Sequence, residues 1–345
     1  MLNLYSYSLN KLEDLMLSLG QKKYRATQLF KWIYEKRVTT FDEMSDVSLS
    51  FRETLNRDFC LNKPKIFKRQ ISKDGTNKLL LELEDGNKIE TVLMRYNYGC
   101  VACVTSEVGC NMGCCFCASG LLKKKRELTV DELVGQVLVL DDILREEGKR
   151  ITHVVVMGTG EPFDNYDNVM DFIRILNHPY GFAIGARHIT VSTCGLVDKI
   201  RQYAHEGLQI NLAISLHAPT NELRNKIMPI NRKYDLNELM DAVKYYEKEA
   251  SRRVTFEYIL LKDINDSTEC ALQLVQLIKG TLAYVNLIPF NPVEEMKYQR
   301  SSSNRVHNFL DVLMKNGITA TIRKEFGTDI DAACGQLRAK NEKAI

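Results

Sequence analysis

Residues 101–117 of this chain read VACVTSEVGCNMGCCFC, and this stretch decides the fold. Its apolar first part, residues 101–106, predicts a buried strand. The strand leads into three cysteines with the spacing C-x3-C-x2-C: Cys110, Cys114 and Cys117. Gly109 and Gly113 favour a loop around these thiols over a helix. A strand that ends in such a loop would place three metal ligands at one end of a sheet.

Beyond this loop, predicted strands and helices alternate. Strands are expected at 151–157, 188–193, 209–215, 253–260, 283–288 and 318–323. Helices are expected near 130–146, 164–177, 195–205, 235–250, 267–279 and 303–315. This alternation is typical of βα units around a parallel sheet. It predicts an α/β fold with a partial (βα)6 barrel, whose active site would lie at the carboxyl ends of the strands.

Two smaller parts precede the predicted barrel. Residues 1–60 show leucines at helical spacing and predict a small helical module. Residues 61–98 contain two Asp-Gly pairs between short apolar runs, which is typical of a three-stranded meander. The expected organisation is a helical module at 1–60, a β-meander at 61–98, a barrel at 99–325 and a C-terminal tail at 326–345.

Composition narrows the class of protein. The chain is 45% hydrophobic and 26% charged, which is ordinary for a globular protein. Its first residues lack the basic start and apolar core of a signal peptide, and no apolar run reaches membrane-spanning length. We therefore expect a cytoplasmic protein with no membrane partner. In that compartment the ten cysteines favour metal binding or catalysis over a disulfide framework.

Basic residues gather in three clusters, although the net charge is only +3. The clusters span 22–37, where aromatic residues are interleaved, 63–69 and 123–126. Phosphate binding requires such clustering. A solvated surface explains each cluster taken alone, and core packing explains the aromatic residues. Together the clusters favour RNA as a partner, with the module at 1–60 and Lys123–Arg126 as the expected contacts.

The three-cysteine spacing has a chemical consequence. Three thiolates on a four-iron cluster leave one iron without a protein ligand. That iron can bind S-adenosylmethionine (SAM), whose reductive cleavage yields a 5′-deoxyadenosyl radical. A zinc site completed by Cys103 or Cys115 is the alternative, and the spacing alone leaves both open.

With this spacing the chain resembles the radical SAM superfamily. Other motifs follow predicted strands, so they would share one rim of the barrel: GTGEP at 158–162, Ser192-Thr193, Ser215-Leu216-His217 and Asn291-Pro292. The segment GTDIDAACGQL at 327–337 resembles the tail of the RlmN and Cfr RNA methyltransferases. GEP at 160–162 and IPFNP at 288–292 are more similar to RlmN than to its sibling Cfr.

The resemblance implies a set of cofactors, ligands and partners. One 4Fe–4S cluster would be bound by Cys110, Cys114 and Cys117, and two SAM molecules would be used per turnover. Contacts to SAM are implied for Gly160, Glu161, Ser192, Ser215, Leu216, His217 and Asn291. The implied substrates are an adenosine of large-subunit 23S rRNA and the adenosine beside the tRNA anticodon. A flavodoxin-like electron donor and a monomeric enzyme are also expected.

The resemblance also implies a mechanism. Carbon 2 of adenine is no nucleophile, so its methylation needs a radical. Cys334 would accept a methyl group from one SAM, and the radical from the second would remove a hydrogen atom from that methyl before it adds to the ring. Glu90 matches the proton acceptor, and Cys103 would release the product through a transient disulfide with Cys334.

Three alternatives remain at this point. One is methylation at carbon 8 of the same adenosine, as in Cfr. Another is a radical enzyme that acts on a protein or a small molecule. The third is a zinc-stabilised RNA-binding protein without catalysis.

Overall fold

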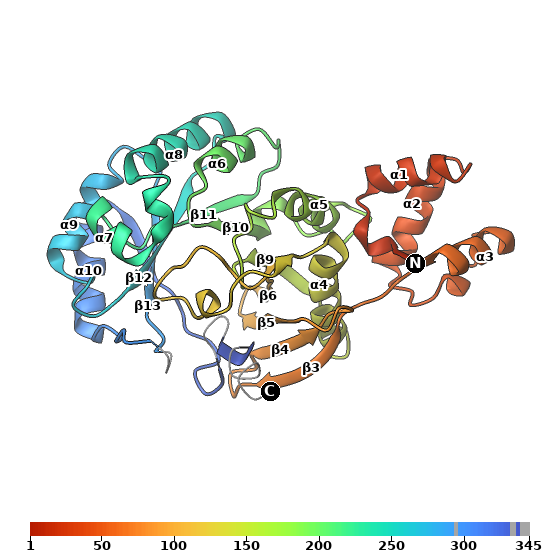
Figure 1. Cartoon of the computed structure of the whole chain (residues 1–345), viewed down its shortest axis with the longest axis horizontal. Coiled ribbons are helices and arrows are strands. Elements are labelled where there is room, and N and C mark those ends of the chain that lie inside the picture. The colour runs from red at the N-terminus through yellow and green to blue at the C-terminus, as the bar shows by residue number, and fades with distance from the viewer. Residues whose placement is uncertain (293–295, 332–335, 339–345) are drawn as a thin grey trace.

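The computed structural model describes residues 1–292, 296–331 and 336–338, and its centre is a ten-stranded sheet (Figure 1). Its parallel strands are β6 (Gly99–Cys103), β9 (Ile151–Val156), β10 (Ile189–Thr193), β11 (Asn211–Ser215), β12 (Val254–Leu260), β13 (Tyr284–Pro289) and β14 (Thr319–Ile322). These strands neighbour one another in sequence order. Their carboxyl ends therefore share one edge of the sheet.

Helices connect the parallel strands and cover their outer face (Figure 1). They are α4 (Val130–Arg145), α5 (Tyr166–Asn177), α6 (Val197–Tyr203), α7 (Asn221–Ile227), α8 (Leu236–Ala250), α9 (Thr268–Leu277) and α10 (Ser303–Lys315). The apolar sides of α4, α5, α6, α8, α9 and α10 join the strands in one continuous core, whereas Ile227 on α7 belongs to a smaller cluster. The predicted α/β fold with a partial barrel is confirmed. Only α7 was absent from the expected helices, because its sequence NELRNKI has no apolar stripe.

The meander continues the barrel sheet. It consists of β3 (Lys65–Ile71), β4 (Asn77–Glu82) and β5 (Lys88–Tyr96), which pair antiparallel, and β5 pairs antiparallel with β6. The two Asp-Gly turns have glycines at φ +82° and +78°, as the sequence predicted. β3 forms an edge of the sheet, is exposed on both faces and has a register shift between Ile66 and Lys68.

The N-terminal module lies at one side of the barrel (Figure 1). Its helices are α1 (Leu9–Ser18), α2 (Tyr24–Phe30), the π-helical turn η2 (Lys31–Glu35) and α3 (Leu49–Asp58), and β1 (Leu2–Asn3) pairs with β2 (Phe59–Cys60). Phe30, Trp32 and Tyr34 are buried, so core packing explains these aromatic residues; Tyr24 is 56% exposed. Asn3 and Ser6 bond to Asp131 at the start of α4 and join the module to the barrel.

None of the helices in the described part of the chain combines the length and the apolar character that a membrane span requires.

Gln136 offers a test of how α4 holds the strand that enters the cysteine loop. Its buried amide accepts from the Thr105 N–H at 2.8 Å and donates to the Thr105 carbonyl at 2.9 Å. Replacing it (Gln136→Leu) leaves both groups buried without these bonds. We expect the free energy of unfolding of the metal-free protein to fall by about 1–3 kcal/mol in urea titration. Gln276→Leu on exposed α9 surface is the control, and equal effects of both variants would contradict the assignment.

Candidate active site

The cysteine loop is closed at its base by backbone pairing. It lies between β7 (Glu107–Val108) and β8 (Arg126–Glu127), which pair antiparallel. Cys110 N–H donates to the Leu122 carbonyl at 3.0 Å. Gly109 has φ +89°, and a side chain there would lie 2.2 Å from the Lys123 carbonyl oxygen. Only glycine fits this closure.

The three thiols lie in apolar surroundings that disfavour negative charge. Burial, and to a smaller extent the neighbouring Cys117, raises the pKa of Cys110 to about 12. Burial, followed by Cys117 and Cys110, also raises the pKa of Cys114. Three mutually repelling thiolates in such a place require cations, which the irons of a cluster would supply. The residues present therefore fit a cluster of this kind.

A four-iron cluster suits the three thiols without requiring that they meet at a single ion. Among the described residues, no group of three or more His, Cys, Asp or Glu side chains is placed to hold one metal ion. A four-iron cluster binds each thiolate on a different iron, so its ligands need not converge on one point. Cys115, one of the two candidates for a fourth zinc ligand beside Cys103, accepts a hydrogen bond from the Tyr298 hydroxyl at 2.9 Å.

A cavity of about 300 Å³ lies beside the loop, at the carboxyl ends of the strands. Predicted site residues from distant parts of the sequence line it: Cys103, Cys117, His217 and Asn291. Phe116, Phe290 and Phe326 supply much of its apolar surface. The structure thus brings together the cysteine loop, the loop after β11, the loop after β13 and the beginning of the tail, as the position of their motifs after predicted strands indicated.

His217 is held as a neutral hydrogen-bond donor. Its Nδ1 accepts from the Ile259 N–H at 3.0 Å, and its ring meets Phe116 edge-on at 4.9 Å between centroids. Burial, and then the charge of Arg224, lowers the pKa of His217 to about 3. Because Nδ1 accepts, the proton of the neutral ring lies on Nε2. The imidazole can therefore donate one hydrogen bond to a ligand in the cavity.

Two serines end neighbouring strands. The hydroxyl oxygens of Ser192 on β10 and Ser215 on β11 lie 3.4 Å apart, and both residues are half-buried. They form a pair of polar groups at the rim. Leu216 is fully buried in the core, so its contribution to a ligand would come from its backbone.

Gly160 and Glu161 shape the loop after β9. Gly160 has φ +107°, and a side chain there would lie 2.6 Å from Glu107. The Glu161 carboxylate is buried and accepts from the N–H groups of Cys194 at 2.7 Å and Phe163 at 3.0 Å. Burial raises its pKa, against these hydrogen bonds. The Glu161 carboxylate thus binds the backbone of the loops. Any contact of Gly160 or Glu161 to a ligand would therefore come from main-chain groups.

Arg224 on α7 is a buried cation at this rim that the sequence did not reveal. Its guanidinium donates to the carbonyls of Cys194 at 2.6 Å, Leu216 at 3.1 Å and Ser215 at 3.2 Å. It also donates to the Asn231 side chain at 3.1 Å. One side chain therefore connects the loops that follow β10 and β11. Its short polar helix gave no signal that could have marked it.

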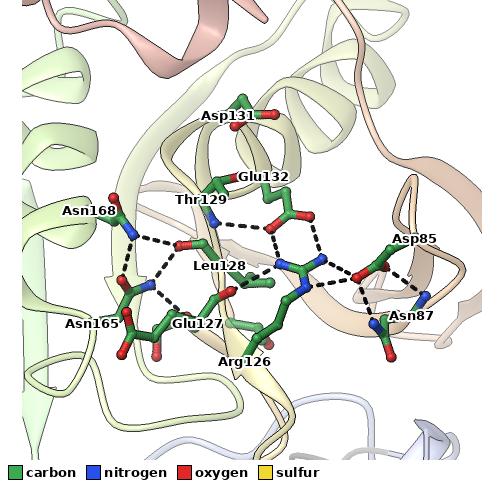
Figure 2. Close-up of polar contacts among 12 residues, drawn as sticks. Asp85, Asn87, Arg126, Glu127, Leu128, Thr129, Asp131, Glu132, Asn165 and Asn168 are labelled. Carbon is green, nitrogen blue, oxygen red and sulfur yellow. Dashed lines mark hydrogen bonds and ion pairs between the residues drawn. The ribbon is translucent and has the colours of Figure 1, made fainter. Parts of the chain in front are cut away.

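Two cations of the basic cluster at 123–126 form ion pairs with acids of the protein. Lys124 pairs with Glu107 at 2.6 Å and with Asp164 at 3.1 Å. Figure 2 shows the Arg126 guanidinium between Glu132, at 2.7 and 2.8 Å, and Asp85, at 2.8 Å from its Nε. Two of the partner acids, Asp85 and Asp164, are about 40 residues away in the sequence. Lys124 and Arg126 thus join the cysteine loop to the meander and the barrel, and their contact with RNA stays a prediction.

Glu90, Cys103 and Lys78 share one face of the sheet. Across β4, β5 and β6 the register aligns Lys78 with Val92 and Val92 with Cys103, and Glu90 lies two residues from Val92. Paired residues and residues two apart face the same side. Glu90 is buried and pairs with Lys78 at 3.0 Å, whereas an isolated strand glutamate is usually solvated. Cys334 lies outside the described residues.

His217 predicts a pH dependence of stability. The folded protein keeps this ring neutral down to about pH 3, whereas the unfolded chain protonates it near its ordinary pKa of 6.5. Lowering the pH from 6.5 toward 3 thus favours unfolding, by up to about 1.4 kcal/mol per pH unit. His217→Asn should lack this contribution to the slope, because asparagine does not titrate. Asparagine is chosen because it tolerates the φ of +59° at this position. Urea titrations of both metal-free proteins between pH 6.5 and 3 measure how the free energy of unfolding depends on pH. Identical slopes for both proteins would contradict the prediction.

Comparison with known proteins places these motifs in a family. A sequence profile of the Radical SAM superfamily matches residues 105–275. A profile described as ribosomal RNA large subunit methyltransferase N-terminal domain matches residues 2–61. Together they cover the helical module and most of the barrel.

Similar proteins cover essentially the whole chain. Probable dual-specificity RNA methyltransferases RlmN of Enterococcus faecalis and Spiroplasma citri are 56% and 53% identical, over 99% and 100% of this chain and 97% and 99% of theirs. A radical SAM methyltransferase from Sphaerobacter thermophilus, known from its crystal structure, is 42% identical with a TM-score of 0.92, over 97% of this chain and 99% of that one. The chain therefore belongs to the RlmN family of the radical SAM superfamily.

Proposed function

We propose that this protein methylates carbon 2 of an adenosine in 23S rRNA, and of the adenosine beside the tRNA anticodon. The observation that carries the proposal is the cavity in which the cysteine loop, His217, Asn291 and Cys103 meet. The names of its relatives, dual-specificity RNA methyltransferases, support an RNA substrate and methyl transfer. The similarity of GEP and IPFNP to RlmN favours carbon 2 over carbon 8.

Cys110, Cys114 and Cys117 would hold one 4Fe–4S cluster, with an iron left open for SAM. Their buried surroundings support this, since the thiols need cations to ionise there. When bound, the cluster and SAM supply a carbon-centred radical that can remove a hydrogen atom from a methyl group. An external flavodoxin-like protein would provide the electron, and two SAM molecules would be used per turnover.

Polar groups at the rim would orient SAM. The Nε2–H of His217 would donate to it, and the Ser192 and Ser215 hydroxyls, 3.4 Å apart, suit its amino acid or ribose. Asn291, which also lines the cavity, would add an amide. Gly160, Glu161 and Leu216 would contribute main-chain groups, because the Glu161 carboxylate binds Cys194 and Phe163 and the Leu216 side chain lies in the core.

Three residues of this chain would carry the methyl group and release it. Cys334 would accept a methyl from SAM and, after loss of one hydrogen atom, become linked to the adenine ring through its methylene carbon. Glu90 would take the ring proton, and the one electron that must leave the adduct before the ring is aromatic again would be accepted by the cluster. The Cys103 thiolate would then attack the Cys334 sulfur, so that the S–C bond breaks, its electrons and a proton complete the new methyl group, and a disulfide forms. The place of Cys103 in the cavity supports this role.

RNA binding would involve the helical module and exposed cations. Lys22, Lys23 and Lys36 are exposed on the module, Lys65, Lys68 and Arg69 are exposed on β3, and Lys123 and Lys125 are exposed on the cysteine loop. Such cations can neutralise phosphates. We propose that the protein works as a monomer in the cytoplasm.

The cluster ligands can be tested one at a time. Cys110→Ala, Cys114→Ala and Cys117→Ala should each lose most of the iron, the sulfide and the brown colour, because three thiolates hold the cluster. Cys270→Ala, on α9, is the matched control and should retain them. Elemental analysis measures the outcome. Stoichiometric zinc with no sulfide in the unaltered protein would support the zinc alternative instead.

The identity of the methylated nucleoside shows which reaction the protein catalyses. Reconstituted protein, reductant and labelled SAM are incubated without oxygen with an rRNA fragment and with a tRNA, and nucleosides are analysed by mass spectrometry. We expect 2-methyladenosine in both RNAs and none with Cys334→Ala, because the methyl passes through that thiol. 8-Methyladenosine would place the activity with Cfr. No methylated adenosine despite an intact cluster would reject an RNA substrate.

A further inference from the structure

Lys78 is a buried lysine at the candidate active site to which the proposed reaction gives no part. It lies on β4, is 1% exposed and lines the cavity beside Val92 and Cys103. Lysines are almost never this deeply buried without a partner of opposite charge. Its partner is Glu90, whose carboxylate oxygen Oε2 lies 3.0 Å from Nζ.

The Lys78–Glu90 pair also binds the C-terminal tail at two points. Lys78 Nζ donates to the Asp331 carbonyl at 2.5 Å. The other carboxylate oxygen of Glu90, Oε1, accepts from the Arg338 N–H at 2.7 Å. The ion pair therefore connects the backbone at position 331 to that at position 338, and Cys334 lies between these positions in the sequence.

Other contacts bring the beginning of the tail to the same place. Gly327 N–H donates to Asp74 at 2.8 Å, and the Gln70 side-chain amide donates to the Asp331 carboxylate at 3.0 Å. Ser72 bonds to Asp329. In Figure 1 this blue segment lies beside β3 and β4. Residues 327–331 thus have several contacts besides the bond from Lys78 to the Asp331 carbonyl, whereas the bond to Arg338 depends on where the Glu90 carboxylate lies.

We propose that Lys78 is a positioning residue, which orients the Glu90 carboxylate and holds the tail on both sides of the methyl-carrying segment. An ammonium group has three donors and no acceptor, so it can fix an anion and a carbonyl at once. This inference rests on the proposed function, in which Glu90 takes the ring proton. Without Lys78, the carboxylate would lose the cation that fixes it, and proton removal would fail after the RNA has become attached.

The test uses the reconstituted holoenzyme and four variants. Lys78→Met removes the charge and keeps the length of the side chain, and Lys78→Arg keeps a charged donor. Glu90→Gln removes the proposed proton acceptor while its amide oxygen can still accept from Arg338. Lys73→Met, at an exposed lysine five residues away, is the matched control. The readouts are iron content, RNA affinity, the rate of product formation, covalent RNA–protein adduct on denaturing gels, and hydrogen exchange of tail amides.

For Lys78→Met we expect unchanged iron content and RNA affinity, with product formation slower on the order of 100-fold, as a misplacement of about 1 Å can cause. The adduct should accumulate, and amides at 336–338 should exchange faster. Lys78→Arg should recover part of the rate, since it restores a charged donor of different shape. Glu90→Gln should accumulate the adduct with tail exchange near that of the unaltered protein. Lys73→Met should match the unaltered protein in every readout.

Two results would overturn the proposal. One is product formation by Lys78→Met within twofold of the unaltered protein. The other is a loss of product with neither adduct nor faster tail exchange, which would show that Lys78 acts elsewhere. If the unaltered protein makes no methylated adenosine, the proposed function fails, and the exchange comparison of Lys78→Met with Lys73→Met still decides whether Lys78 holds the tail.

Discussion

The candidate site depends on buried charges that bind loop backbone. The peptide groups of Cys194 show this most directly, because its N–H donates to the Glu161 carboxylate and its carbonyl accepts from the Arg224 guanidinium. Both side chains are buried. In the protein interior such bonds are stronger than in water, and leaving a charged partner unpaired there costs the most free energy. The loops after β9, β10 and β11 are thus fixed relative to one another before any ligand binds. Preorganised groups of this kind suit a reactive intermediate that must meet its target in one geometry.

Much of the fold could be predicted, because its signals are local. Apolar periodicity marked the strands and the longer helices, and the motifs that follow β9, β10, β11 and β13 had to meet once the strands were parallel. The rest depended on contacts between distant positions. Nothing near Arg126 in the sequence announces Asp85, and nothing near Arg224 announces the carbonyls that it binds. A count of charges cannot distinguish a basic side chain that contacts RNA from one that pairs with an acid of the protein. That distinction needs the tertiary structure.

The meander proves to be part of the candidate site. The sequence suggested a separate extension at 61–98, yet β5 pairs with β6, and one face of β4, β5 and β6 carries Lys78, Glu90 and Cys103. The same strands and their turns bind the tail through Ser72 and Asp74. Residues separated by more than 200 positions therefore cooperate through a sheet that contains both the barrel and the meander.

The exposed edge strand β3 has a consequence for the solution behaviour of the molecule. A free edge offers unpaired backbone groups to any other extended chain, and Ile66, Phe67 and Ile71 on this strand are exposed apolar side chains. The register shift after Ile66 and the cations Lys68 and Arg69 oppose such pairing, because two copies would meet with like charges and mismatched backbones. The basic and irregular character of β3 thereby opposes fibre-like self-association of the protein.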